Sequence, residues 1–190
     1  MAQGVYHYIR EAWKNQPREV TQGRLIEWRA SDSAVKVDRP LRLDRARALG
    51  YKAKKGFVVI RIRLNRGGRK RTRHKHGRKV RKQHVSKILK MSYRWVAEMR
   101  ASTAYNNLEV LNSYPIGKDG RHAFFEVIMI DPAMPEIKSD KNLNWLVSAK
   151  NKNRTERGLT SAGKKSRGMK TKSHNLKVRP SQRAWGRMGK

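Results

Sequence analysis

The chain of 190 residues contains no cysteine. Without thiols it can form no disulfide, no thiolate zinc site and no cysteine nucleophile, and this composition fits an intracellular protein. Long apolar runs are also missing: none approaches the roughly 20 residues that span a bilayer, and the basic segments lack the apolar face of an interfacial helix. The first residues, MAQGVYHYIREAWK, contain no apolar core of a secretion signal. We therefore expect neither secretion nor a membrane partner.

Acidic residues are scarce. The chain has 14 Asp and Glu against 47 Lys and Arg, which gives a formal net charge of +33. A compact fold of this charge repels itself unless a polyanion neutralises it, and the composition favours nucleic acid as that polyanion. Residues 45–97 hold twenty cations and no acid, and residues 141–190 hold fifteen cations and one acid, whereas 1–44 carry +2 and 98–140 carry −3. Two basic blocks thus alternate with two of ordinary charge.

The apolar pattern predicts an α+β fold. A spacing of 3.6 residues indicates helices over 5–13, from Pro17 through Trp28, over 43–49 with Asp44 as N-cap and Gly50 as the stop, over 85–99, and near 143–149. Strand-like runs cover 57–64, 108–116 and 123–130, and the turn at 117–120 joins the last two into a hairpin. We expect a small antiparallel or mixed sheet covered by helices, with a long basic loop and an extended basic C-terminal arm.

We divide the chain into a body, residues 1–149, and a C-terminal arm, residues 150–190. In the arm the apolar periodicity weakens and Gly, Ser, Asn and Lys dominate, so it would bury too little apolar surface to order itself without RNA. The body contains the basic loop, residues 66–84, with the sequence RGGRKRTRHKHGRKVRKQH. Because a strand precedes this loop and a helix follows it, the body would fix both ends and aim the cations.

The basic loop has three interpretations: a phosphate-binding segment, a nuclear address, or solvated charge. The second basic block, residues 141–190, favours the first interpretation, in which the loop binds a partner. Gly67 and Gly68 allow the backbone to approach a ligand closely, arginines supply planar donor forks, and lysines supply point charges. His74, His76 and His84 lack the carboxylates that a metal or acid–base site needs, so we expect neutral histidines that stack on bases or donate to phosphate.

The segment GLTSAGKKS, residues 158–166, nearly matches a nucleotide-binding P-loop. Gly158, Gly163 and Lys164 fit the pattern, but Lys165 stands where Ser or Thr would hold magnesium, and no strand precedes the segment. We interpret it as a turn held against RNA phosphates. No catalytic set of residues is found elsewhere in the sequence.

The five tryptophans are candidate stacking platforms for bases. Trp13, Trp28 and Trp95 lie on apolar helical stripes and are expected in the core. Trp145 is ambiguous. Trp185 lies between Arg183 and Arg187 in the C-terminal arm, where it would stack on a base or pack on another protein.

Three longer segments carry a resemblance to a known family. They are RLDRARALGYKAKKGFVVIRIRLNRGGRKR (42–71), VLNSYPIGKDGRHAFFEVIMIDP (110–132) and RGLTSAGKKSRG (157–168). In this order, together with VYHYIREAWK near the N-terminus, they resemble the e-type family of archaeal and eukaryotic large-subunit ribosomal protein fifteen, and its archaeal branch in particular. The similarity runs over nearly the whole chain.

The resemblance implies a non-enzymatic component of the large ribosomal subunit, in the cytoplasm. It implies an α+β body with extensions among ribosomal RNA helices, and contacts with neighbouring large-subunit ribosomal proteins. It implies RNA contacts for Lys52, Lys54, Lys55, Arg66, Gly67, Gly68, Arg69, Lys70 and Arg71, and for Arg157, Gly158, Ser161, Gly163, Lys164, Lys165, Ser166 and Arg167. To these we add, as RNA-binding candidates, Arg61, Arg63, Arg73, His74, Lys75, His76, Arg78, Lys79, Arg81, Lys82, Arg154, Lys170, Lys172, Arg179, Arg183, Trp185 and Arg187.

We expect no cofactor, metal site or small-molecule substrate, apart from magnesium or potassium ions that accompany folded RNA. Recognition would follow backbone and shape, and affinity would fall by about 0.7–0.9 log units per contact per log of salt. Two alternatives belong to other classes. A DNA-compacting protein would have the same charge, and only the family resemblance argues against it; a ribonuclease or RNA-modifying enzyme would need a catalytic set that the sequence lacks.

Overall fold

A four-stranded antiparallel sheet forms the centre of the computed structural model, which describes residues 3–68, 76–77, 89 and 91–170. In the order β1-β2-β4-β3, its strands are Ala34–Val37 (β1), Phe57–Asn65 (β2), His122–Ile130 (β4) and Glu109–Lys118 (β3). β2 and β4 pair along their whole lengths, from Phe57 opposite Ile130 to Asn65 opposite His122. The predicted α+β class and the predicted hairpin are confirmed, and β1 is an additional edge strand.

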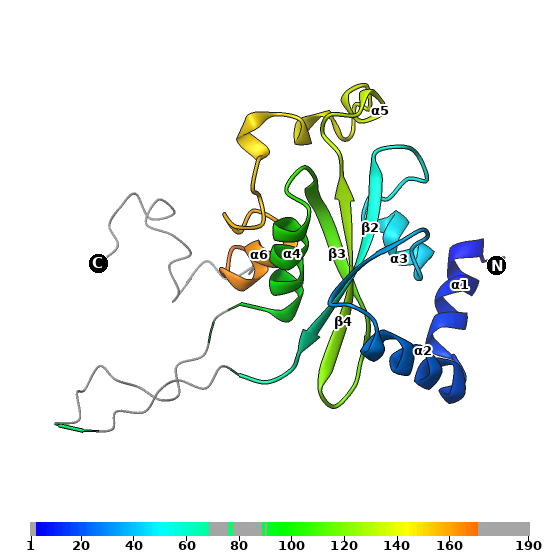
Figure 1. Ribbon diagram of the computed structural model, residues 1–190. Helices are drawn as coiled ribbons and strands as arrows, with labels where there is room; N and C mark the ends of the chain where they lie inside the picture. The colour runs from blue at the N-terminus through cyan, green and yellow to red at the C-terminus, as the bar shows by residue number, and fades with distance from the viewer. Residues whose placement is uncertain (1–2, 69–75, 78–88, 90, 171–190) are drawn as a thin grey trace.

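Helices cover both faces of this sheet (Figure 1). On one side lie α4 (Tyr93–Ala104) and α6 (Ser161–Ser166), and on the other lie α1 (Val5–Lys14), α2 (Arg18–Ala30) and α3 (Leu43–Ala48). The short helix α5 (Pro135–Lys138) and two 3-10 turns, η1 (Asn144–Leu146) and η2 (Ala149–Asn151), follow β4. Within the described residues, no helix has the length and apolar character needed to cross a membrane.

The alternation in β2 explains why the sheet has two cores. Ile60, Ile62 and Leu64 point to one face and pack with residues of β3, β4 and α4, including Ala97 and Ala101. The opposite face packs under α2 and α3, where Trp28, Ala46, Tyr114, Phe124 and Ile128 form the second cluster. As predicted, Trp28 is buried and Ile60, Ile62 and Leu64 share one face of β2, which the structure packs against α4.

Two predicted helix starts differ from the structure. Helix α4 begins at Tyr93 and not near residue 85, because the Ser92 hydroxyl accepts the Trp95 N–H at 3.3 Å and caps the helix. Residues 89 and 91 are not helical, and residues 85–88 lie outside the described part. Helix α3 has Arg42 at its N-cap, so Asp44 lies buried in the first turn and is not the predicted cap. Gly50, with a φ of +99°, follows the helix as predicted.

The apolar stripe of α1 is not part of the core. The helix forms as predicted, but Val5 and Tyr8 are 70% and 62% exposed. Its contribution to the second cluster is Trp13, which is partly buried below the guanidinium of Arg42 at 5.0 Å from the ring centre. The 3.6-residue period therefore identified the helix but not the surface that it packs against.

The segment after residue 150 packs against the body as far as it is described. Thr155, Thr160 and Ala162 are buried, and α6 lies against α4 (Figure 1). This part was expected to be extended, because its apolar residues are few. Hydrogen bonds to buried groups of α4 and β3 replace the missing apolar contacts. Residues 171–190 lie outside the described residues, and the division at residue 150 stays a prediction.

Candidate nucleic-acid interface

A tyrosine hydroxyl holds the start of the basic loop against the beginning of α4. Gly67, which follows β2, donates its N–H to the Tyr93 hydroxyl at 2.7 Å, and that hydroxyl donates to the Gly67 carbonyl at 3.2 Å. Gly67 has a φ of +108°, a conformation that favours glycine. Arg66 is held beside it, since its N–H donates to the Arg121 carbonyl at 2.7 Å and its guanidinium donates to the Asp119 carbonyl. The chain thus leaves and re-enters the body at one place.

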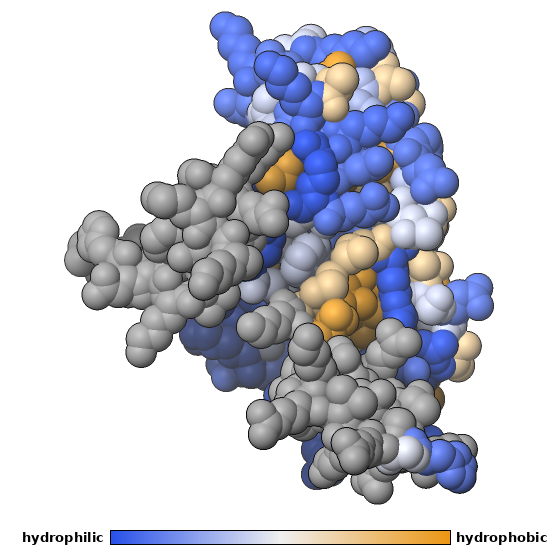
Figure 2. Space-filling view, turned by 90° about the vertical axis from the view of Figure 1, so that its left-hand side faces the viewer, coloured by the Kyte–Doolittle hydropathy of each residue, from blue (hydrophilic) through white to orange (hydrophobic). Residues whose placement is uncertain are grey.

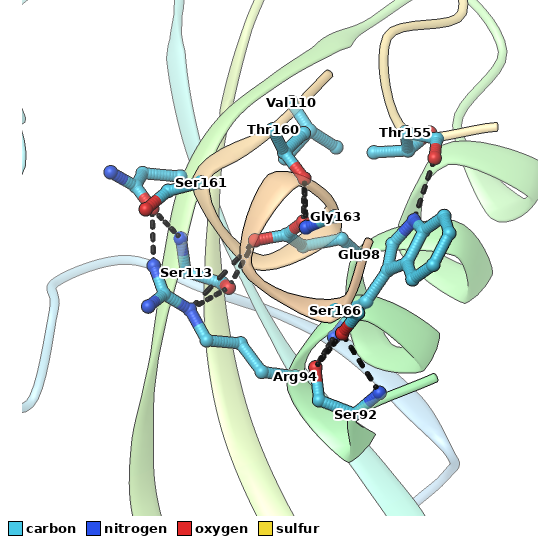
Figure 3. A network of polar contacts seen from close by, with 12 residues as sticks. Ser92, Arg94, Glu98, Val110, Ser113, Thr155, Thr160, Ser161, Gly163 and Ser166 are labelled. Atoms are coloured by element: carbon cyan, nitrogen blue, oxygen red, sulfur yellow. Dashed lines mark hydrogen bonds and ion pairs between the residues drawn. The ribbon is translucent and has the colours of Figure 1, made fainter. Parts of the chain in front are cut away.

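The C-terminal segment joins the body at the same place. The Ser92 N–H donates to the Ser166 hydroxyl at 3.2 Å, and this hydroxyl donates to the Ser92 hydroxyl at 3.2 Å. Figure 3 shows the two serines facing one another at the start of α4. Because Ser166 ends α6, the chain that follows Gly67 and the chain that follows Ser166 both begin beside the N-terminus of α4. We call these two stretches, residues 67–92 and 167–190, the two basic segments.

The buried carboxylate of Glu98 lies in α4, one turn after the start of this helix. Glu98 of α4 is fully buried and accepts from the Thr160 hydroxyl at 2.5 Å and from the Ser113 hydroxyl of β3 (Figure 3). Arg94 lies 3.9 Å from the carboxylate and donates to Ser113 at 2.9 Å. Burial raises the pKa of Glu98, opposed by the two hydroxyl hydrogen bonds and the charges of Arg94 and Arg154. The carboxylate therefore ties α4, β3 and the C-terminal segment together.

The lysines between α3 and β2 fall into two classes. The ammonium groups of Lys52 and Lys54 both lie 2.7 Å from one oxygen of Asp140, and Lys54 also donates to the Glu136 carbonyl at 2.9 Å. These hydrogen bonds hold the pKa of Asp140 well below its usual range. Lys55 is exposed and has no hydrogen bond or ion pair with any described residue. Of the three, Lys55 has its charge free for a phosphate.

The arginines of β2 bind the body through their guanidinium groups. Arg61 lies over the Trp28 ring at 5.4 Å from its centre and 3.9 Å from the Glu27 carboxylate, with a mostly covered side chain. Arg63 donates to the Arg29 carbonyl at the end of α2. Both residues therefore hold α2 on the sheet, and their contact with RNA stays a prediction.

Arg154 and Arg157 have different surroundings. Arg154 is only 8% exposed, donates to the Val110 carbonyl at 2.6 Å and lies 4.6 Å from the centre of the Trp145 ring. Burial lowers the pKa of Arg154, opposed by the carboxylates of Glu109 and Glu98. Arg157 is exposed, although it donates to the carbonyls of Lys150 and, at 2.8 Å, Lys152.

The glycines of the P-loop-like segment pack against protein. A Cβ at Gly163 would lie 2.7 Å from the Gly158 Cα, and a Cβ at Gly158 would lie 2.7 Å from Cδ of Arg167 and 3.1 Å from the Trp95 ring. Gly158 also has a φ of +63°. These positions require glycine for a backbone-to-backbone contact inside the molecule, so no ligand is needed to explain them.

The outer surface of α6 carries the remaining described candidates. Ser161 accepts from the Lys170 ammonium at 2.8 Å. Arg167 donates to the carbonyls of residues 157 and 158 at 3.1 and 3.2 Å. Lys165 and Lys170 are exposed, whereas Lys164 is partly buried. Lys165 in this helix and Lys170 after it thus offer exposed ammonium groups near the end of α6.

The candidates that lie outside the described residues are Arg69, Lys70, Arg71, Arg73, His74, Lys75, Arg78, Lys79, Arg81, Lys82, Lys172, Arg179, Arg183, Trp185 and Arg187. Gly68 and His76 are exposed. Where the structure describes the chain, no group of three His, Asp or Glu is arranged to hold a metal ion. Tyr93, which holds the start of the loop against α4, was not a predicted site residue, because nothing in the sequence pairs it with Gly67.

Four of the thirteen acids of the body are buried. Asp44, Glu98, Glu109 and Glu126 are buried, and Glu126 accepts from the Tyr114 hydroxyl and, at 3.2 Å, from the Leu41 N–H. Burial raises the pKa of Glu126. These four acids therefore contribute no exposed carboxylate to the surface.

Figure 2 shows the side of the molecule that faces left in Figure 1. Hydrophilic side chains cover much of it, and a smaller hydrophobic patch lies among them. An apolar groove between β1, β2 and α4 is lined by Ala34, Ile62, Leu89, Met91, Val96 and Met99. The surface that bears the origin of both basic segments is thus predominantly polar, with one apolar groove.

Comparison with known proteins identifies the family of the chain. The family described as Ribosomal L15 matches residues 4–185. The chain is also 48% identical to the large ribosomal subunit protein eL15 of Methanocella arvoryzae, an archaeon, over 196 aligned positions that cover all of both chains. Both matches agree with the resemblance in the sequence segments 42–71, 110–132 and 157–168. The chain therefore belongs to the L15e family of ribosomal proteins.

Proposed function

We propose that this chain binds and stabilises folded ribosomal RNA through the cations of its two basic segments and of the adjoining surface of the body. The broader role follows from the family: the chain is a structural component of the large ribosomal subunit in the cytoplasm, and it is not an enzyme. Its partners are accordingly ribosomal RNA and other ribosomal proteins. The DNA-compacting alternative finds no support in the family match.

The observation that carries the proposal is the common origin of the two basic segments. The contacts of Gly67 with Tyr93 and of Ser92 with Ser166 hold their starting points together. Like charges repel, so bringing two cationic segments to one place raises the electrostatic free energy of the protein alone. A polyanion that lies across both segments removes this cost, which favours a ligand with closely spaced phosphates.

Binding of this kind has a defined thermodynamic signature. Each phosphate that a Lys or Arg neutralises releases condensed counterions, so the affinity falls linearly on a log–log plot against salt. The deep groove of A-form RNA excludes side chains from base edges, and recognition then depends on backbone and shape. Arginine forks suit phosphate oxygens, while lysines such as Lys55 and Lys165 contribute point charge.

A salt titration of RNA binding tests the proposal. Full-length protein would be titrated into a folded fragment of large-subunit ribosomal RNA, and into duplex DNA of equal length, over a series of salt concentrations. We expect tighter binding to the RNA. Replacing Arg69, Lys70 and Arg71 by Gln should reduce the slope by about 0.7–0.9 for each lost contact and leave unfolding cooperative.

A matched variant controls for net charge. Replacing Arg10, Arg18 and Lys36, which are exposed on or near α1, α2 and β1, removes the same three charges away from the origin of the basic segments. We expect this variant to keep the wild-type slope. If both triple variants change the slope equally, or if the protein never sediments with large subunits from cell extract at low salt, the proposal is wrong.

A further inference from the structure

We propose that Trp145 is a stacking platform for one unpaired nucleobase of the bound RNA. This inference rests on the proposed function and adds a base-binding site to it. Trp145 lies in η1, which belongs to neither of the two basic segments. The residue is 41% exposed. An indole ring has two faces on which flat groups can stack, and each nucleobase offers a matching face.

The ring of Trp145 is held in one orientation by three contacts. Its Nε1–H donates to the Asn142 carbonyl at 3.0 Å, which fixes the edge of the ring. The side-chain amide of Asn151 donates to the Trp145 carbonyl, which fixes the backbone. The guanidinium of Arg154 lies 4.6 Å from the ring centre and covers one face. Because the ring is already immobilised, a base that stacks on it loses little of the free energy that ordering a side chain costs.

Arg154 is itself a rigid support. It is 8% exposed, and its guanidinium donates to the Val110 carbonyl of β3 at 2.6 Å. The cation on the covered face is attracted by the π-electrons of the indole. Because Arg154 occupies one face of the indole, a stacked base would take the opposite face.

The surroundings favour a base over a protein side chain. A protein-binding hot spot lies in the well-packed apolar centre of an interface. The apolar residues next to Trp145 in sequence, Leu143 and Leu146, are buried and add no exposed apolar surface around the ring. The exposed residues around η2 include Lys150 and Lys152, whose backbone carbonyls both accept from Arg157. Asn151, which stands between these two lysines, bonds the Trp145 carbonyl, so their exposed charges belong to the same turn as the ring. An aromatic ring combined with nearby cations is typical of single-stranded nucleic-acid sites.

Two probes separate stacking from charge. The first is a twelve-nucleotide oligo(A), which offers bases and phosphates, and the second is inorganic polyphosphate of similar charge, which has no base. Trp145→Leu should weaken oligo(A) binding by about 5- to 150-fold, the range for loss of one stacked base. It should leave polyphosphate binding and the salt slope for oligo(A) unchanged, because no cation is lost. Trp145→Phe keeps an aromatic face and should keep most of the oligo(A) affinity.

The matched control removes charge beside the ring. Lys150→Gln with Lys152→Gln should weaken both probes and lower the salt slope by about 0.7 per lost contact. The platform is overturned if Trp145→Leu binds oligo(A) like the wild type, which would assign the ring to a protein neighbour. It is also overturned if Trp145→Leu weakens both probes equally, or if Trp145→Phe is as weak as Trp145→Leu. If the wild type shows no salt-dependent binding to either probe, the proposed function itself fails.

Discussion

The hydroxyl of Tyr93 makes two hydrogen bonds with the backbone of Gly67, one at 2.7 Å from the N–H and one at 3.2 Å to the carbonyl. These bonds connect the second residue after β2 with the first residue of α4. Most of the basic loop lies between Gly67 and Tyr93 in the sequence. The Tyr93 hydroxyl therefore holds together the two positions between which the loop runs. The neighbouring Ser92 binds Ser166, which brings the C-terminal segment to the same point.

Tyr93→Phe removes both hydrogen bonds and keeps the ring. Because the site is partly exposed, we expect the free energy of unfolding to fall by about 1 kcal/mol, measured by urea denaturation. The RNA affinity should also fall while the salt slope stays unchanged, because the cations of the loop remain but are oriented less well. Tyr8→Phe, at an exposed tyrosine, is the control and should change neither quantity. Equal RNA affinity of Tyr93→Phe and wild type would contradict the role of this contact.

Thr160→Val removes a hydroxyl with two functions. It deletes the 2.5 Å hydrogen bond to Glu98 and the cap on the Gly163 N–H at 3.2 Å. Loss of the cap and of one bond to a buried carboxylate should lower the free energy of unfolding by about 2 kcal/mol. Hydrogen exchange should locate the loss in residues 161–166. Thr103→Val, at an exposed position of α4, should change stability by no more than about 0.5 kcal/mol; a loss of the same size there would refute this account.

The pH dependence of stability should show the buried position of Glu98. Its folded-state pKa is raised by burial above the ordinary 4.5, so between these two values the folded protein binds more protons than the unfolded chain. The free energy of unfolding therefore falls as the pH rises through this window, and the contribution of Glu98 is fully present below it. Glu98→Gln should make the fall shallower in urea denaturation from pH 4 to 8. Glu126, whose pKa is also raised, should leave a residual slope. An unaltered pH profile in Glu98→Gln would count against a raised pKa.

Neutralising Lys55 should change RNA binding, whereas neutralising Lys54 should mainly change stability. Lys55→Gln should lower the salt slope of RNA binding by about 0.7–0.9 and leave stability unchanged, because its ammonium has no partner among the described residues. Lys54→Gln should reduce stability, since Asp140 and the Glu136 carbonyl lose a donor, and should affect the slope less. RNA titrations and urea denaturation of both variants measure the difference. The same slope for both variants would show that the internal ion pair does not decide which lysine meets RNA.

Local periodicity predicted the parts of the fold that local interactions determine. The alternation in β2 and the turn residues predicted at 117–120 were sufficient for the strands and the hairpin, because side chains point to alternate faces of a strand. In the structure β3 continues to Lys118, and residues 119–121 form the connection. β1 was not predicted, since four residues give too short a pattern and their partner in β2 lies more than twenty residues away. The start of α4 was misplaced because the apolar residues before Ser92 have the same helical spacing as those after it. In the structure the helix begins only after Ser92, which is its N-cap.

Composition indicated a polyanion as partner but could not sort the cations. Lys52 and Lys54 have the same chemistry as Lys55, yet Asp140 holds the first two from more than eighty residues away. Gly158 and Gly163 fit a phosphate-binding pattern in sequence, but the structure uses them for contact with one another. Trp145 was ambiguous because exposure depends on how its neighbours fold over it.

The sequence by itself determined the class of partner, the family, the α+β class and most elements, because charge balance, residue order and local periodicity are properties of the linear chain. Only the tertiary structure decided which cations are free, which acids are buried and where the two basic segments begin. Those properties depend on contacts between residues far apart in sequence, such as Gly67 with Tyr93 and Glu98 with Thr160. Such contacts form when the sheet and the helices pack together. Local periodicity and charge balance do not show which distant residues this packing brings into contact.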